Sequence, residues 1–364
     1  MTGTQAPAAG RILLVDDDEN QLKTLAAEVT AALDGEVAGS VTTWLPDRTD
    51  DVERQFSELA QGATLVVTDY DLTRGQSGFF GVSIVAWCQR AAIPVGDYSR
   101  GNATNLPAPP NLFGFRFPPE TDEAAREIKA VYGGFREIDR ALEDRPSLLE
   151  MPSPASMLAD MLGHPSAVTQ FSLYMPPIGA YGGLADRLRA TRGQSAGKER
   201  RVLWTYVLGH VLFNFIMRYP GPILDVHALC SYLAVSDDEA DRIKPLFDGA
   251  QYEGPFSTLR PSFWRDRIDD MVETWALESE LDYTGHLPSY RRALVEEKLG
   301  AALGRYPCPR CEGDRGGFRC PFTKATVCER DDCSVGSSGW IPQGADLSRV
   351  ERTFFDETSP MLGS

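Results

Sequence analysis

The chain has little positive charge, few histidines and no long hydrophobic run. Its 364 residues contain 36 Lys and Arg against 52 Asp and Glu, so the formal net charge is −16. Such a surface repels nucleic acid and anionic membranes, and the composition therefore disfavours both as general partners. The most apolar stretch, 202–217, contains Thr205 and Asn214 and is too short and too polar to span a bilayer. We predict a buried helix there.

Residues 1–10 also lack the basic start and apolar core of an export signal. We therefore expect a cytoplasmic protein without a membrane partner. The few histidines have neither a neighbouring nucleophile nor a metal-ligand spacing, so no hydrolytic site is predicted. They are His164, His210, His227 and His286.

The first part of the chain alternates short apolar runs with helical patterns. Strands that alternate with helices over about 120 residues indicate a parallel sheet covered on both faces. We predict an α/β doubly wound fold with a five-stranded parallel sheet. The expected strands lie at 11–15, 37–42, 64–68, 93–95 and 112–115, and the expected helices at 22–33, 50–60, 81–92 and 120–141.

Two of these apolar runs end in acidic residues. Asp16 and Asp17 follow the first run, and Asp69 and Asp71 follow the third. Neighbouring parallel strands open at the same edge of a doubly wound sheet, so we expect Asp16, Asp17 and Asp69 to lie together. Like charges that close are costly without a cation, and Mg²⁺ prefers such oxygen ligands. The plainer alternative is that Asp69 and Asp71 only begin a turn.

With these residues in place, the segment 10–135 resembles the receiver domain of two-component response regulators. The resemblance rests on the stretches ILLVDDDE, VVTDYDL and IPVGDYS. It implies a Mg²⁺ site formed by Asp16, Asp17 and Asp69, with Asp71 contributing its backbone carbonyl.

The same resemblance assigns chemistry to Asp69 and Ser99. It implies that Asp69 accepts a phosphoryl group from a sensor histidine kinase and that Ser99 is the switch residue that bonds this group. Receivers end the fifth strand with a Lys-Pro pair, but Phe117 or Pro118 stands at the Lys position here. Arg116 is near, although strand alternation is expected to turn it to the other face.

Five of the seven cysteines lie within 26 residues near the C-terminus. Cys308 and Cys311 form a C-x2-C pair, and Cys328 and Cys333 a C-x4-C pair after sixteen intervening residues. Without an export signal, such a cluster indicates metal rather than disulfides. Four thiolates fit a structural Zn²⁺ site that resembles zinc ribbons in general, with Cys320 as a substitute ligand.

The predicted organisation is multidomain, and it leaves two main hypotheses of function. The first is a signalling protein that relays a phosphoryl group from Asp69 through helical and zinc-binding output domains. The second is a non-catalytic adaptor that binds proteins through a degenerate receiver and the zinc module. A third, nucleic-acid binding through the basic segment 187–201, is disfavoured by the overall charge. The predicted parts are a receiver-like domain at 10–143, a linker at 144–155, an all-α domain at 156–304, a zinc-binding module at 305–342 and a tail at 343–364.

Overall fold

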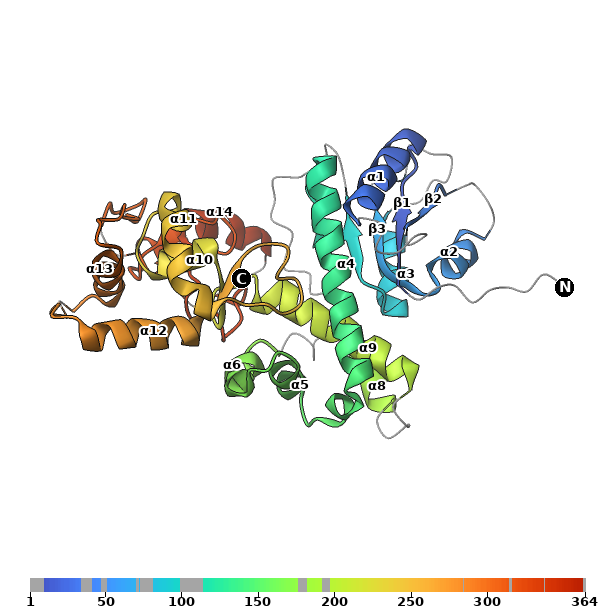
Figure 1. The fold of residues 1–364 in the computed structure, drawn as a ribbon. Coiled ribbons are helices and arrows are strands. Elements are labelled where there is room, and N and C mark those ends of the chain that lie inside the picture. Colours follow the sequence, from blue (N-terminus) through green and yellow to red (C-terminus); the bar gives the residue numbers. More distant parts are fainter. Residues whose placement is uncertain are drawn as a thin grey trace. The chain divides into compact units, whose positions relative to one another are not determined.

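The structure is a computed structural model, and the chain in it forms two compact units (Figure 1). The first unit comprises residues 1–151 and 181–210, and the second comprises 152–180 and 211–364. These units divide the chain at other points than the predicted domain boundaries, which stay predictions. The residues that the structure describes are 10–33, 41–46, 51–69, 72, 81–98, 114–175, 182–191, 197–283, 285–313, 316–336 and 338–362.

Five parallel strands form the sheet of the first unit, as predicted (Figure 1). Their order is β2-β1-β3-β4-β5, which places the reversal of strand order between β1 and β3. Doubly wound sheets bind ligands at this switch point, outside the C-terminal ends of the strands. The strands are β1 (Arg11–Val15), β2 (Val41–Trp44), β3 (Ala63–Thr68), β4 (Val95–Asp97) and β5 (Phe115–Arg116).

Helices cover both faces of this sheet, because alternate side chains of each strand point to opposite sides. One core joins Val15, Val66 and Val95 to Phe56 of α2 and Ile84 of α3. On the other face α1 packs beside α4 and α4 contacts β3. The four helices are α1 (Glu19–Ala32), α2 (Val52–Ala60), α3 (Gly81–Ala91) and α4 (Thr121–Asp144).

Two further helices belong to the first unit, α8 (Gly182–Ala190) and α9 (Lys198–Val211). The predicted apolar helix is confirmed as α9, which continues as a π-helix over Leu212–Ile216. The predicted linker is ordered between Pro146 and Glu150, where a 3₁₀-helix buries Leu148 and Leu149. Arg200 of α9 donates to the backbone carbonyl of Leu149 at 2.6 Å and so binds this segment to the unit.

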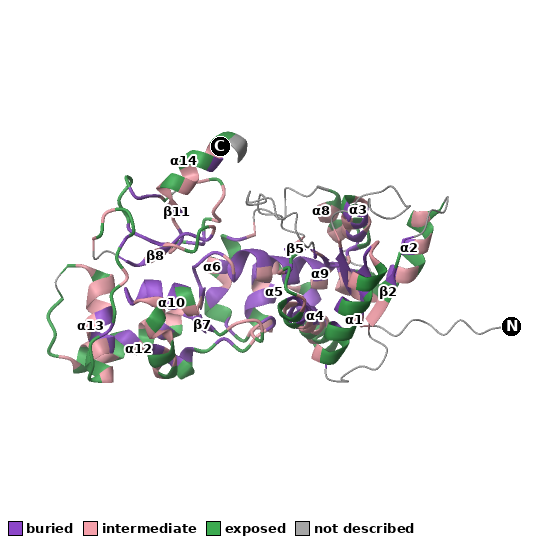
Figure 2. Cartoon of the chain, turned by 90° about the horizontal axis from the view of Figure 1, so that it is seen from above, coloured by how far each residue is buried: buried purple, intermediate pink, exposed green. Residues whose placement is uncertain are grey.

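The second unit is mainly helical, but the expectation of an all-α region needs a correction. β6 (Ile223–Asp225) pairs antiparallel with β7 (Ser262–Trp264) inside it. Its core (purple in Figure 2) includes Leu229 of α10, Ile268 of α12 and Phe247 of the 3₁₀-helix Lys244–Ala250. The helices are α5 (Pro154–Met161), α6 (Val168–Ser172), α10 (Val226–Tyr232), α11 (Ala240–Ile243), α12 (Arg265–Glu278) and α13 (Leu287–Leu299).

The predicted tail also forms regular structure. Its helix α14 (Arg352–Leu362) stacks Phe354 on Phe322 with ring centroids 5.3 Å apart and places Phe355 5.0 Å from Trp340. The short strands of this region are β8 (Phe318–Arg319), β9 (Thr326–Val327), β10 (Ser334–Val335) and β11 (Val350–Glu351), paired as β8-β9 and β10-β11. Within the described part of the chain, every helix is too short or too polar to cross a membrane.

Gly209 and Gly133 provide a matched test of helix packing in the first unit. A Cβ atom on Gly209 of α9 would overlap the ring of Phe135 on α4, whereas one on Gly133 would meet no atom within 4 Å. We expect Gly209→Ala to lower the free energy of unfolding by about 1–3 kcal/mol through overpacking. Gly133→Ala should raise it by about 0.5–1 kcal/mol through helix propensity. Urea denaturation of both variants measures the difference, and equal effects would contradict the packing of α9 on α4.

His210 makes the stability of the first unit sensitive to acid. It is fully buried between the rings of Phe115, Phe135 and Tyr206, and burial lowers its pKa from 6.5 to about 3. Above pH 6.5 neither state carries the proton. Below it the unfolded chain binds a proton that folded His210 does not, so the free energy of unfolding falls as the pH falls toward 3.

The expected slope in this window is about 1.4 kcal/mol per pH unit. His210→Phe keeps an aromatic ring and removes the titration, so its stability should fall less between pH 7 and pH 5 than that of the wild type. Urea midpoints at the two pH values provide the comparison. Identical losses in both proteins would show that His210 is not held neutral.

Candidate metal centres

Three carboxylates meet at the C-terminal edge of β1 and β3. Asp16 and Asp17 follow β1, Asp69 follows β3, and one oxygen of each lies within 4.8 Å of the others. The amide of Asp69 donates to the carbonyl of Val15 at 3.0 Å, which carries the backbone ladder past the last paired residues. The expected convergence of these carboxylates is therefore present at the switch point of the sheet.

Asp16 is the most buried of the three, with 4% of its surface exposed. Burial raises the pKa of Asp16 to about 6, and the negative charges of Asp69 and Asp17 raise it as well. The amide of Asp18 donates to Oδ1 of Asp16 at 2.8 Å and partly opposes the rise. A divalent cation would offset both the burial and the repulsion. Oxygen ligands of this kind suit Mg²⁺, so the residues fit the predicted ion.

Asp18, the third acid of the same run, has a structural role. Its carboxylate accepts from the amides of Asn20 at 2.9 Å and Gln21 at 3.1 Å and thereby caps the N-terminus of α1. The run of acids after β1 thus supplies two carboxylates to the cluster and one to the helix.

Phe117 stands level with Asp69 on the same face of the sheet. The amide of Tyr98 donates to Thr68 at 3.0 Å and that of Phe117 to Asp97 at 2.8 Å, so these residues extend successive rungs. Phe117 is 3% exposed, and its ring fills the space that a side chain on Gly96 would need. Phe117, which stands at the position where a receiver has its Lys, therefore packs against Gly96 of β4.

Arg116 turns to the opposite face, as alternation requires, and pairs with Asp97 at 3.6 Å. It therefore does not supply the charge that a receiver takes from its Lys. Asp71 and Ser99, the expected carbonyl ligand and switch residue, lie outside the described residues, and their roles stay predictions.

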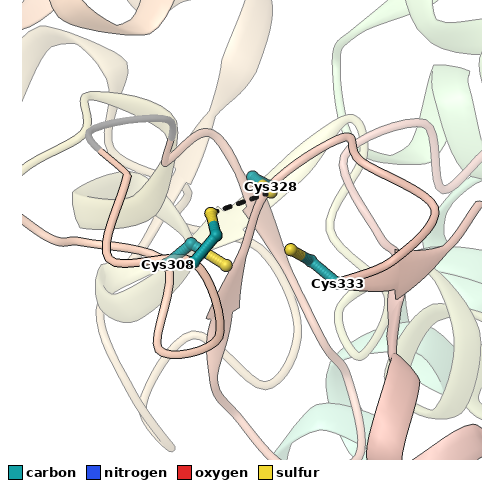
Figure 3. Close-up of side chains that lie close together, drawn as sticks. Cys308, Cys328 and Cys333 are labelled. Carbon is teal, nitrogen blue, oxygen red and sulfur yellow. Dashed lines mark hydrogen bonds between the residues drawn. The ribbon is translucent and has the colours of Figure 1, made fainter.

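Four cysteines form the second cluster. The sulfurs of Cys308, Cys311, Cys328 and Cys333 all lie within 4.8 Å of one another. Figure 3 shows Cys308 from one loop and Cys328 and Cys333 from another pointing toward a common centre. The Sγ atoms of Cys311 and Cys328 are 3.9 Å apart, too far for a disulfide. Sulfurs around a tetrahedral Zn²⁺ at about 2.3 Å would be about 3.8 Å apart, so the donor set fits this ion.

Backbone hydrogen bonds shape the two loops that carry these thiols. The amide of Cys308 donates to Gly313 at 3.1 Å, and the amide of Glu312 returns to Cys308 at 2.9 Å. In the second loop the amide of Cys333 donates to Arg330 at 2.9 Å. Both C-x2-C and C-x4-C segments therefore form tight turns that direct their sulfurs inward.

The thiols differ in how readily they ionise. Burial disfavours the Cys308 thiolate, but the amides of Arg310, Cys311 and Cys328 donate to it and lower its pKa to about 7. Burial is the largest cause that raises the pKa of Cys333, to about 12, and hydrogen bonds with the neighbouring thiols are the next. Without a cation, the four neighbouring thiols do not all ionise together, because their negative charges would repel one another. A bound cation would favour the thiolate at each position.

Cys320 does not belong to the cluster, which corrects its expected role as a substitute ligand. It is fully buried in the turn between β8 and β9, where its sulfur accepts from the amide of Thr323 at 3.4 Å. Cys88 and Cys230 are buried and form no disulfide.

Sequence reasoning missed the side chains that support the second loop. The hydroxyl of Ser334 donates to the carbonyl of Cys328 at 2.5 Å, and Arg349 donates to Ser334 Oγ at 2.6 Å. Arg349 lies in the segment expected to be a tail, and only its place beside β10 reveals this role. No local sequence signal identifies a support fifteen residues away.

Comparison with models of known protein families, with curated proteins and with solved structures finds no significant match for this chain. The likeness to a receiver therefore rests on the acidic strand ends and on the parallel sheet with its flanking helices.

The cysteine cluster predicts one zinc ion per chain. We expect Cys308→Ser and Cys333→Ser to lose this ion and to lower the melting temperature, because the loops around the cluster then lack their common ligand. Cys320→Ser is the matched control, since it replaces a buried cysteine of the same region and should retain the metal. Elemental analysis of the purified proteins measures zinc per chain. Full zinc in the Cys308 variant would contradict the assigned ligands.

Proposed function

We propose that the chain is a signalling or regulatory protein whose first unit binds Mg²⁺ and accepts a phosphoryl group on Asp69. The observation that supports this best is the convergence of Asp16, Asp17 and Asp69 at the switch point of a β2-β1-β3-β4-β5 sheet. The second unit, with its cysteine cluster, would provide the contacts to an output partner.

The chemistry proposed for Asp69 is an in-line phosphoryl transfer. A carboxylate oxygen of Asp69 attacks the phosphorus of a phosphohistidine on a sensor kinase, the phosphorus–nitrogen bond breaks, and the imidazole leaves and takes up a proton. Asp16 and Asp17 would hold Mg²⁺, which neutralises charge on the phosphoryl oxygens when bound. Asp16 is suited to this role because burial and an amide donor hold its carboxylate in one position.

Phe117 favours a second candidate function, that of a non-catalytic adaptor. A buried ring at the level of Asp69 offers no charge to a phosphoryl group, and Arg116 is paired with Asp97 on the other face. In this alternative the first unit and the zinc-binding region are protein-binding surfaces, and the carboxylates hold a metal only.

Phosphorylation with a small donor separates the two candidates. On incubation with acetyl phosphate and Mg²⁺, we expect the intact mass to rise by one phosphoryl group, as acetate leaves from the phosphorus. Asp69→Ala should show no rise. Asp97→Asn, which alters a carboxylate at the next strand end, should behave as the wild type. No rise in the wild type, or an equal rise in Asp69→Ala, would reject phosphoryl transfer and favour the adaptor.

A further inference from the structure

A cavity of about 320 Å³ lies in the first unit at the opposite edge of the sheet from Asp69. Its floor is formed by residues that precede or begin the strands, namely Gly10, Gly62 and Pro94. Helices α4 and α9 form its walls. Every lining residue belongs to the first unit, and the volume is at the lower end of the range for small-molecule sites, about 300–1,000 Å³.

The lining of this cavity includes apolar and aromatic residues. Val202 of α9 and Ala63 of β3 are half-buried there, and the almost fully buried Phe135, Tyr206 and Ala92 border it. Phe135 and Tyr206 are themselves buried, so the wall is held by the core of the unit and does not depend on surface side chains.

The rim of the cavity is basic in an otherwise acidic chain. Its two acids, Asp139 and Glu143, both bind Arg201, at 3.0 and 2.5 Å. Three further cations line the same cavity, namely Arg136, Arg140 and Lys198. The charge of one of them, Arg140, interacts with Glu137, which lies outside the lining. Arg136 donates to the hydroxyl of Tyr132 at 3.3 Å, and its guanidinium lies beside Gly10, which also lines the cavity.

We propose that this cavity binds a small amphiphilic organic anion. The carboxylate or phosphate of such a molecule would lie at the rim, where Arg and Lys recognise these groups. Its apolar body would lie against Val202 and Ala63, next to the buried rings of Phe135 and Tyr206. A single-stranded nucleic acid would need an extended basic groove with stacked aromatic rings, which a cavity of this size does not offer. The inference is independent of phosphoryl transfer, because it involves the other ends of the strands.

Anilinonaphthalene sulfonate, an aromatic anion with environment-sensitive fluorescence, is a suitable probe for the full chain. We expect saturable binding at one site. Val202→Trp should abolish it by filling the cavity, and Arg136→Gln with Arg140→Gln should weaken it about tenfold by removing charge at the rim. Arg126→Gln is the matched control on α4, because Arg126 is exposed and pairs with Asp122 at 3.0 Å outside the cavity.

Two further measurements address the obvious objections. The dye also binds exposed apolar side chains, and Leu277 is 84% exposed. Leu277→Ser should therefore leave the binding unchanged if the dye occupies the cavity. Octyl phosphate or octanoate should displace the dye, and whichever does so at lower concentration identifies the preferred anionic group. Octylammonium should not displace it.

The proposal fails if a folded Val202→Trp variant, judged by circular dichroism, binds the dye as the wild type does. Equal displacement by octylammonium, or an unchanged affinity of the double Arg variant, would also overturn it. The rim substitutions are at half-buried and exposed positions, so they keep the test valid even if Val202→Trp does not fold.

Discussion

The register of β1 against β3 determines both ends of the first unit. At one end Val15 pairs with Thr68, which brings Asp16 beside Asp69; at the other, beyond a shift of register between Arg11 and Ile12, Arg11 pairs with Ala63, where the cavity begins. A shift of one residue would turn every side chain of β3 to the opposite face. Asp69 would then leave the carboxylate cluster, and the Val66 side chain would leave the core that it shares with Val95. The pairing of these two strands thus positions an acidic edge at one end and a basic cavity at the other.

The second unit depends on a different constraint near its C-terminus. β8 to β11 have two residues each and cannot by themselves hold the loops around them. The order of this region comes from the four facing thiols, from Arg349 bound to Ser334, and from the aromatic packing of α14 on Phe322 and Trp340. A metal bound to the thiols would link two loops that the chain separates by sixteen residues, and would replace the large core that the region lacks.

Much of this structure follows from local sequence patterns, and the rest depends on contacts between distant segments. Short β-branched runs identify the sheet, helical periodicity identifies its helices, and acidic strand ends identify the cluster of Asp16, Asp17 and Asp69. Cysteine spacing identifies the four cysteines that cluster, but it could not exclude Cys320, because only the course of the β8-β9 turn buries its sulfur elsewhere. Similarly, no local signal joins α9 to the first unit or pairs β6 with β7. Those arrangements depend on shape, such as the absence of a side chain on Gly209 where Phe135 packs.

The pairing of Gly96 with Phe117 limits how this edge of the sheet can change. The ring of Phe117 fills the space left by Gly96, so neither position can be altered independently. A Lys at 117 would leave an unfilled volume above β4, and a larger residue at 96 is accommodated only once the ring has gone. The order of change at this edge is therefore fixed: the ring of Phe117 has to be replaced, at a packing cost, before position 96 can carry a larger side chain.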